Sequence, residues 1–247
     1  EDGWTQPAAN DAGLALGAAY HVYNSKLGRP RTYTMKHAFY GPGFDTETIR
    51  KALEIGKIPH REIDDPSRTA AELVAQDKIV GWFQGRQEVG PRALGNRSIL
   101  ANPRRADMKD IVNRYVKHRE PYRPFAPSAM EDHTPDYFDI DRPNPYMLIV
   151  CDVRPEKRDE VPAITHVDGT GRLQTVSREE NPLYWKLIDE FRKITGPPVV
   201  LNTSFNIRGE PIVTTPEDAL KCYFTTGLDA LVLDRFLVEK SPEESCS

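Results

Sequence analysis

The chain has 247 residues, of which 38% are hydrophobic and 28% are charged. This composition is typical of a soluble globular protein and excludes an intrinsically disordered chain. The formal net charge of −4 gives the whole molecule no field that would attract a polyanion, so no nucleic-acid partner is expected. No stretch approaches the roughly 18 consecutive apolar residues of a membrane span, so no membrane partner is expected either.

The N-terminal part predicts one helix followed by a linker. Residues 10–19 are rich in small side chains, which suit a helix that packs closely against a larger neighbour. Residues 24–46 show no sustained hydrophobic period and contain three glycines and two prolines, as linkers do. A regular pattern of elements begins only at about Asp65.

From Asp65 onward the pattern predicts helices alternating with strands. Asn181 and Pro182 form an N-cap and an N1 proline, and Gly196 ends the helix that they begin. The alternation predicts an α/β fold with a largely parallel or mixed sheet. The expected helices are Ser67–Gln76, Asp107–Val116, Asn181–Gly196 and Thr215–Gly227, and the expected strands are Lys78–Phe83, Tyr146–Val153, Gly171–Val176, Val199–Leu201 and a pair within Leu231–Val238.

Cysteine and histidine usage limits the chemistry. Cys151, Cys222 and Cys246 lie far apart without a C-x-x-C pair, which favours a reducing compartment, and no signal peptide is apparent. A cytoplasmic location is therefore expected. The six histidines show no H-x3-H or H-E-x-x-H spacing, so the sequence predicts no complete metal site within the chain.

The segment Gly81–Phe125 is basic although the chain is acidic. It contains ten Lys or Arg and four Asp or Glu, a local charge of +6 that indicates an anion site. Within it, Gly85–Ser98 has the G-x4-G spacing of a P-loop but lacks the Lys-Ser/Thr ending, and Pro91 has no N–H for a phosphate. Phosphate contacts are therefore expected from its three arginines, Arg86, Arg92 and Arg97. A solvated loop with surface arginines is the alternative interpretation.

Two further motifs carry polar groups suited to phosphates. In Lys117–Ser128, an extended backbone would place Lys117 and Arg119 on one face, where they could hold a triphosphate or a small phosphorylated acid. In Asn202–Asn206, small polar groups follow a buried strand, at the place where open α/β sheets bind ligands. A charged loop and an ordinary Asx or Ser/Thr turn are the respective alternatives.

A fourth motif, His166–Gln174, is first of all a turn. Arg172 and Gln174 follow the turn and could face a pocket, whereas His166 is better explained as a structural histidine than as a catalyst.

Taken together, these residues resemble a known family. Lys117-x-Arg119 with Ser204-x-Asn206 resembles the K-x-R and S-x-N signature of the YrdC-like fold, whose members make carbamoyl-type adenylates. The longer strings resemble the C-terminal domain of the O-carbamoyltransferases, which act on nodulation factors, cephalosporins and aminoglycosides. The strings that carry this resemblance are GWFQGRQEVGPRALGNRSILANPR, VKHREPYRPFAPS, HVDGTGRLQTV and LNTSFNIRGEPIVTTPEDAL.

The resemblance implies a division of the chain. Residues 65–247 would form a YrdC-like domain, a twisted open mixed sheet flanked by helices. Residues 1–64 would comprise a helical remnant of an N-terminal actin-like transfer domain and a linker. In the family that domain transfers the carbamoyl group with a divalent metal, for which iron is a candidate, held by two histidines and an aspartate; Asp11 occupies the aspartate's place, and the histidine pair lies outside this chain.

The resemblance also implies the reaction and its site. Carbamoyl phosphate and ATP, with Mg²⁺, would give carbamoyl adenylate for transfer to a small-molecule hydroxyl acceptor. Lys117 and Arg119 would hold ATP phosphates, and Arg92 and Arg97 a second anion. The remaining expected ligand-binding residues are Arg123, Asn202, Ser204 and Asn206 for the nucleotide and Arg172 to close the pocket.

Two other functions stay open at this point. A threonylcarbamoyl-adenylate synthase for tRNA modification shares the K-x-R and S-x-N pair, and threonine-dependent product formation would identify it. A non-enzymatic RNA-binding module would use the basic segment, and a steep salt dependence of RNA binding would reveal it. Assembly into a homo-oligomer is also left open by the sequence.

Overall fold

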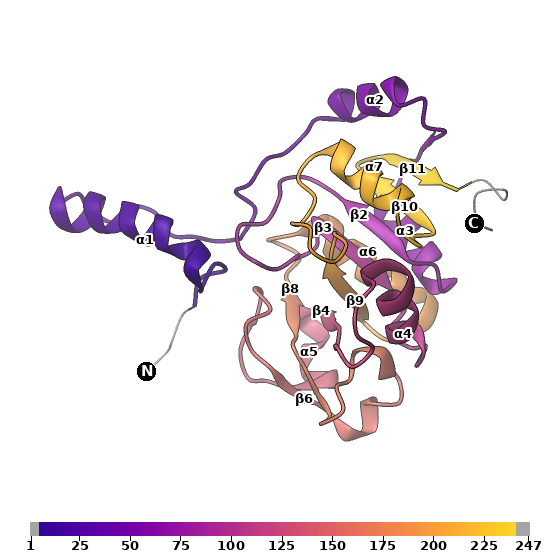
Figure 1. Ribbon diagram of the computed structural model, residues 1–247. Coiled ribbons are helices and arrows are strands. Elements are labelled where there is room, and N and C mark those ends of the chain that lie inside the picture. Colours follow the sequence, from indigo (N-terminus) through magenta and orange to yellow (C-terminus); the bar gives the residue numbers. More distant parts are fainter. Residues whose placement is uncertain (1–4, 241–247) are drawn as a thin grey trace.

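The computed structural model describes residues 5–240. Within that range a mixed sheet has eight strands in the order β1-β11-β10-β2-β3-β9-β4-β8 (Figure 1). The pairs β10/β2 and β4/β8 are parallel, and the other neighbours are antiparallel. The strands are β1 (Arg61–Glu62), β2 (Val80–Phe83), β3 (Arg97–Ala101), β4 (Ala126–Met130), β8 (Gln174–Val176), β9 (Val199–Ser204), β10 (Ala230–Leu233) and β11 (Phe236–Glu239). The expected α/β fold with a mixed sheet is confirmed.

A second, smaller sheet lies beside the first. It consists of β5 (Phe138–Asp139), β6 (Cys151–Val153) and β7 (Thr170–Gly171), in that order and antiparallel. Cys151 and Cys222 are buried free thiols, and Cys246 lies outside the described residues.

The helices begin and end at the residues that their capping chemistry dictates. The Asn181 side chain accepts from the Tyr184 N–H at the start of α6, and Thr215 with Asp218 forms a capping box at the start of α7. The helices are α1 (Leu14–Tyr20), α2 (Thr46–Ile55), α3 (Pro66–Ala75), α4 (Met108–Val112), α5 (Thr134–Tyr137), α6 (Pro182–Thr195) and α7 (Pro216–Phe224). Two of them continue as π-helical turns, α1 through His21–Lys26 and α4 through Asn113–Lys117.

Helices cover both faces of the main sheet, as the alternation of side chains along its strands requires. On one face, Val80, Trp82 and Val200 pack with residues of α3 and α6. On the other face, Phe83 and Leu201 pack with residues of α2, α4 and α7. The strand β9 therefore contributes successive residues to opposite cores, and its polar C-terminal end is left between the two layers of helices.

The N-terminal helix projects away from the sheet (Figure 1). Its residues are exposed; Leu14, for example, is 69% exposed. Residues 46–62 behave differently, because Ile49 and Leu53 of α2 are buried in the core and β1 pairs with β11. The predicted division between residues 64 and 65 stays a prediction, but α2 and β1 belong to the packed body. None of the described helices is long and apolar enough to cross a membrane.

Two predicted strands were wrong in extent. Only Cys151–Val153 of the segment 146–153 is a strand; Met147 has a left-handed backbone (φ 57°), and the Asn144 amide binds the Ile149 carbonyl. The predicted strand 171–176 is two strands, because β7 pairs in the small sheet and β8 in the main sheet. The strands β3 and β4 and the helix α2 were not predicted.

Gly81 provides a test of the packing. A Cβ at this position of β2 would lie 2.9 Å from Phe205 and 3.1 Å from Leu231, so Gly81→Ala should lower the free energy of unfolding by about 1–3 kcal/mol. Gly17→Ala in α1 is the matched control: a Cβ there meets nothing within 4 Å, and the change should raise helix stability by about 0.5–1 kcal/mol. Chemical denaturation measures both. Equal effects of the two substitutions would contradict the packing.

Candidate functional site

Polar segments from four parts of the chain meet at the C-terminal end of β9. They enclose a cavity of about 90 Å³, called the arginine cavity below, which has room for about three water molecules. The volume suits one phosphate-sized group rather than a whole nucleotide. Its lining residues are Pro91, Arg92, Ala93, Arg119, Pro124, Phe125, Ala126, Met147, Arg172, Asn202, Thr203 and Ser204.

Three guanidinium groups dominate this cavity. Arg92, Arg119 and Arg172 come from separate segments, no carboxylate is among the lining residues, and none of the three forms an ion pair within residues 5–240. Burial lowers the pKa of each, and for Arg172 burial together with the neighbouring charges of Arg92 and Arg119 lowers the pKa to about 10. A cavity that holds three mutually repelling cations is built for an anion.

Arg119 is held by its neighbours in a fixed orientation. Its Nε donates to Oδ1 of the buried Asn113 at 2.7 Å, and its guanidinium lies 4.6 Å from the centre of the Phe125 ring. Asn113 begins the π-helical turn that continues α4, and Arg119 lies two residues after the end of that turn. Sequence reasoning missed Asn113, because nothing in a helical pattern marks an asparagine as a support for a residue beyond the helix.

Arg92 lies in the loop between β2 and β3, which is organised by an internal carboxylate. Oε1 of the buried Glu88 accepts from the backbone N–H groups of Leu94, Asn96 and Arg97 at 2.7, 2.8 and 3.2 Å. Within the G-x4-G spacing, the N–H groups of Gln87 and Val89 donate to the carbonyls of Pro42 and Ala38 at 2.9 and 2.7 Å, so they are not free for a ligand. The loop therefore presents an arginine side chain to the cavity rather than its backbone.

Arg172 occupies the crossover between the two sheets. The chain leaves the small sheet at Gly171 and joins the main sheet at Gln174, and this break directs Arg172 to the cavity. Gln174 itself is buried beneath the cavity, as is Ser128 of β4.

Lys117, Ser204 and Asn206 form a hydrogen-bonded cluster beside the cavity. The Lys117 ammonium donates to the carbonyl oxygen and, at 3.3 Å, the hydroxyl of Ser204, and to the carbonyl and side-chain oxygens of Asn206 at 3.0 and 2.8 Å. Lys117 is only 4% exposed. Burial, with a smaller effect of the Arg119 charge, lowers the pKa of Lys117 to about 7. Ser204 also lines the arginine cavity, so it connects the two groups.

A buried polar network forms the floor of the cavity. The Asn202 amide nitrogen donates to Ser128 Oγ at 2.9 Å, to Gln174 Oε1 at 3.1 Å and to the Ala93 carbonyl at 3.2 Å. Asn202 Oδ1 is buried and has no hydrogen-bond partner among the described residues. The structure thus brings together seven of the predicted site residues: Arg92, Lys117, Arg119, Arg172, Asn202, Ser204 and Asn206.

Comparison with known proteins identifies the family of the chain. Residues 71–240 match the family model described as "Carbamoyltransferase C-terminus". The chain belongs to this family. It is 49% identical over 250 residues to the nodulation protein NolO of Bradyrhizobium diazoefficiens and 48% identical over 255 residues to the nodulation protein NolNO of Sinorhizobium fredii. These alignments cover 98% and 99% of this chain but only 45% and 37% of the two relatives, so the chain spans less than half of their length.

Among solved structures, the chain is similar to full-length HypF in its phosphate- and nucleotide-bound form, with a TM-score of 0.50. The sequence identity is 18%, and the match covers 74% of this chain and 23% of HypF. At this identity the likeness concerns the fold, which is the YrdC-like fold that the sequence predicted.

Other predicted residues of this carbamoyltransferase C-terminal chain lie outside both the arginine cavity and the Lys117 cluster. Arg97 is fully buried over the Phe83 ring and donates to backbone carbonyls, among them that of Gln84 at 2.7 Å. Arg123 is exposed and pairs with Glu120 at 3.0 Å. Asp11 lies in an exposed 3-10 turn, and within residues 5–240 no group of three or more His, Cys, Asp or Glu could hold a metal.

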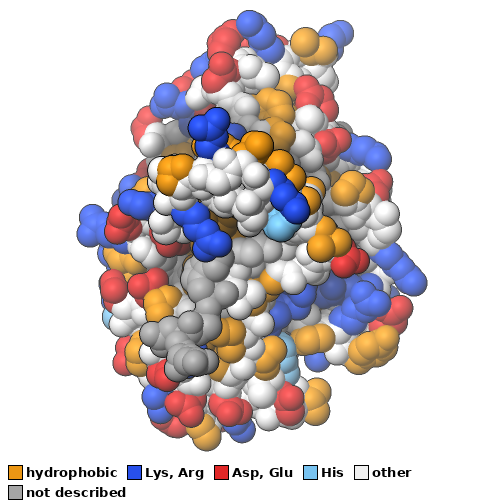
Figure 2. All heavy atoms as spheres, turned by 90° about the vertical axis from the view of Figure 1, so that its left-hand side faces the viewer, with side chains coloured by type: hydrophobic (Ala, Val, Ile, Leu, Met, Phe, Trp, Pro, Cys, Tyr) orange, Lys and Arg blue, Asp and Glu red, His pale blue; other side chains and the backbone are white. Residues whose placement is uncertain are grey.

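The cations of the basic segment have different environments. Arg97 and Lys117 are buried, Arg105 pairs with Asp107, and Arg86 donates to the carbonyls of Tyr40 and Gly41. Figure 2 shows acidic and basic side chains interspersed over one face of the molecule, with several basic side chains close together in one area. Part of the local charge of +6 is therefore used in contacts within the molecule.

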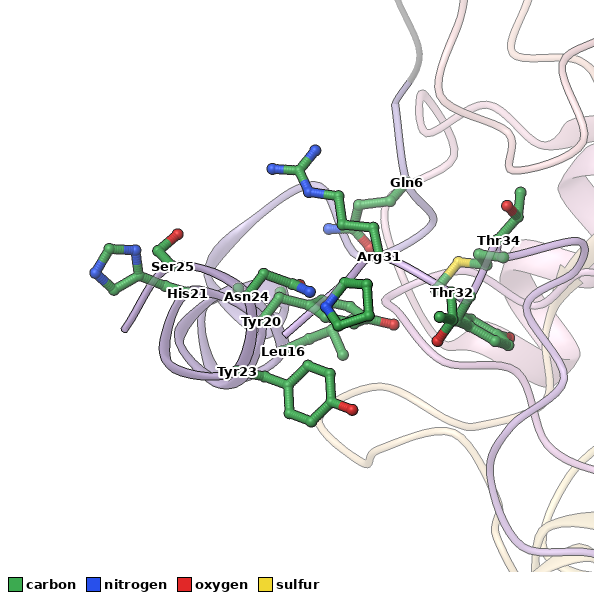
Figure 3. A pocket seen from close by; sticks show the side chains of 15 residues that line it. Gln6, Leu16, Tyr20, His21, Tyr23, Asn24, Ser25, Arg31, Thr32 and Thr34 are labelled. Atoms are coloured by element: carbon green, nitrogen blue, oxygen red, sulfur yellow. The ribbon is translucent and has the colours of Figure 1, made fainter. Parts of the chain in front are cut away.

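A larger cavity lies elsewhere. It measures about 730 Å³ and is lined only by residues 6–35, between the N-terminal helix and the chain that follows it (Figure 3). Tyr20 and Tyr23 extend from the helix toward the strand-like segment that carries Arg31 and Thr32. None of the predicted phosphate-binding residues lines this larger cavity.

Arg97 should be required for stability. Arg97→Met would leave the carbonyls of Gln84, Asn96, Pro42 and Gly85 without this donor, and should lower the free energy of unfolding by about 2–5 kcal/mol. Chemical denaturation followed by circular dichroism is the measurement.

The matched control is Arg105→Met. Arg105 is exposed and pairs with Asp107, so this change should leave the free energy of unfolding nearly unchanged. If Arg97→Met were as mild as Arg105→Met, the interior role of Arg97 would be refuted.

Lys117 should make stability depend on pH. Its pKa is about 7 in the folded chain against 10.5 when exposed, so between these values the unfolded state binds more protons. The free energy of unfolding of the wild type, relative to Lys117→Met, should therefore rise with pH across this window, by at most about 1.4 kcal/mol per pH unit. Denaturation at a series of pH values measures it. A constant difference would show that the folded-state ammonium keeps its proton.

Proposed function

We propose that this chain forms carbamoyl adenylate from carbamoyl phosphate and ATP. One observation carries the proposal: the guanidinium groups of Arg92, Arg119 and Arg172 share a phosphate-sized cavity that has no carboxylate in its lining. We infer the substrate class from membership in the carbamoyltransferase family, and the anion site from the cavity.

The proposed reaction has two steps. Water cleaves carbamoyl phosphate to carbamate and inorganic phosphate. A carbamate oxygen then attacks the α-phosphorus of ATP, forming the mixed anhydride and releasing pyrophosphate. In both steps negative charge develops on phosphate oxygens, and preorganised cations stabilise such charge most effectively in a cavity with little water.

The residues divide this work between them. The forked guanidinium groups can each contact two oxygens of one phosphate, and the cavity volume fits the carbamoyl donor. We place the ATP phosphates at Arg119 and at the adjoining cluster of Lys117, Ser204 and Asn206, because Ser204 borders both regions. Mg²⁺ would be carried by the phosphate oxygens, since the described residues offer no cluster of carboxylates. No nucleophilic side chain is needed.

Transfer to an acceptor concerns the longer protein. The relatives are more than twice as long as this chain, and we propose that transfer to a hydroxyl group of a small molecule or oligosaccharide uses a separate N-terminal domain. Asp11 would then join metal ligands from that domain. Because the reaction consumes ATP, we also propose a cytoplasmic location.

The arginine cavity is tested by conservative substitution. Arg119→Lys keeps the charge but loses the fork, so carbamoyl-phosphate-dependent pyrophosphate release and ATP affinity should fall by about 10- to 100-fold. Arg123→Lys is the matched control, since Arg123 is exposed, pairs with Glu120 and lies outside the cavity; it should change neither. Titration calorimetry and a pyrophosphate assay are the measurements. If the two variants behaved alike, the cavity would not take part in the reaction.

A further inference from the structure

Asn202 presents an acceptor without a donor at the floor of the arginine cavity. The residue is 1% exposed and lines the cavity, and its Oδ1 has no partner among the described residues. An unpaired buried acceptor is costly, and proteins keep one where a ligand or an ordered water supplies the missing donor. A ligand that brings an N–H or O–H group to this end of the cavity would supply the missing donor.

The orientation of the Asn202 amide is fixed by its surroundings. Its nitrogen faces the Ala93 carbonyl and Gln174 Oε1. Gln174 is itself oriented, because its nitrogen donates to the Leu94 carbonyl at 2.9 Å and its oxygen accepts from Ser128 Oγ at 2.6 Å. Exchanging the oxygen and nitrogen of Asn202 would set its oxygen against two carbonyl oxygens, so Oδ1 is an acceptor by necessity.

The arginines cannot satisfy an N–H group of a ligand. Arg92, Arg119 and Arg172 are donors only. Ser204 Oγ already accepts from Lys117 and donates to Asn206 Oδ1 at 2.7 Å. A ligand that carries both phosphate oxygens and an amino group would find donors on the arginines and needs an acceptor elsewhere in the cavity. Carbamoyl phosphate carries both.

We propose that Asn202 Oδ1 accepts a hydrogen bond from the amino group of the carbamoyl donor, and that this contact selects carbamoyl phosphate over other acyl phosphates. The inference rests on the proposed function, because it places the donor in the arginine cavity. Ser128 and Gln174 act as positioning residues, which hold the Asn202 amide with its oxygen toward the ligand.

Acetyl phosphate is the decisive probe, because it replaces the amino group by a methyl group and keeps the phosphate. The wild-type protein should bind freshly dissolved carbamoyl phosphate about 10- to 100-fold more tightly than acetyl phosphate, since the methyl group leaves Oδ1 unpaired. Titration calorimetry with inorganic phosphate as a third ligand measures the affinities. Equal affinity for the two acyl phosphates would overturn the inference and would show that Oδ1 is satisfied by an ordered water only.

Two variants test whether Asn202 causes the preference for carbamoyl phosphate over acetyl phosphate. Asn202→Ala should bring the ratio of the two affinities close to one while inorganic phosphate still binds. Arg105→Met is the control: Arg105 is exposed, pairs with Asp107 and does not line the cavity, so this variant should keep the preference for carbamoyl phosphate. A preference that survives in Asn202→Ala would refute the contact. If Asn202→Ala fails to fold, the wild-type comparison decides alone.

The same titrations separate this inference from the proposed function. If inorganic phosphate does not bind, or binds equally well to Arg172→Met, the anion site itself is rejected, and the amine contact with it. If phosphate binds in an Arg172-dependent manner and the two acyl phosphates bind equally, only the amine contact is rejected.

Discussion

Repulsion among three guanidinium groups is the constraint around which the site is built. The charges of Arg92 and Arg119 help to lower the pKa of Arg172, and no carboxylate lines the cavity to offset the three positive charges. Arg119 is held by the buried Asn113, whereas Arg92 and Arg172 come from the loop around Glu88 and from the passage between the sheets, and the Nε of each has no hydrogen-bond partner among the described residues. Under the proposed function, an entering phosphate would offset the repulsion and supply acceptors for these groups.

Two buried cations, Arg97 and Lys117, differ in their hydrogen-bond partners. Arg97 lies between the Phe83 ring and four backbone carbonyls, so its charge stabilises the connection between β2 and β3. Lys117 also has carbonyl partners, but these come from the very segment that borders the cavity. Under the proposed function, the Lys117 ammonium would exchange the side-chain oxygens of Ser204 and Asn206 for phosphate oxygens, whereas Arg97 donates to backbone carbonyls of loop residues.

The sequence predicted much of the fold, and the structure brings seven of the predicted site residues together. Helices α3, α6 and α7 were found because their caps and apolar faces are local signals. The strand β4 was missed because Ala126–Met130 contains a proline and a serine and reads as a loop, although both are buried between β8 and β9. Arg97 could not be separated from Arg92, since two arginines in one loop look alike until the strand direction is known. Asn113 and Glu88 act through distant backbone and side-chain contacts that no local pattern marks.

The glycine-rich loop bears on why we place the anion at arginine side chains. Its sequence has the spacing of a phosphate-binding loop, yet the N–H groups of Gln87 and Val89 within that spacing donate to the carbonyls of Pro42 and Ala38. Farther along the loop, Glu88 Oε1 accepts from the backbone N–H groups of residues 94, 96 and 97. A carboxylate held at that place would repel a phosphate bound to the same backbone, so under the proposed function the ligand is bound by side chains that reach beyond the loop. The backbone of the loop thus stabilises the fold, and its Arg92 side chain lines the cavity together with guanidinium groups from other segments.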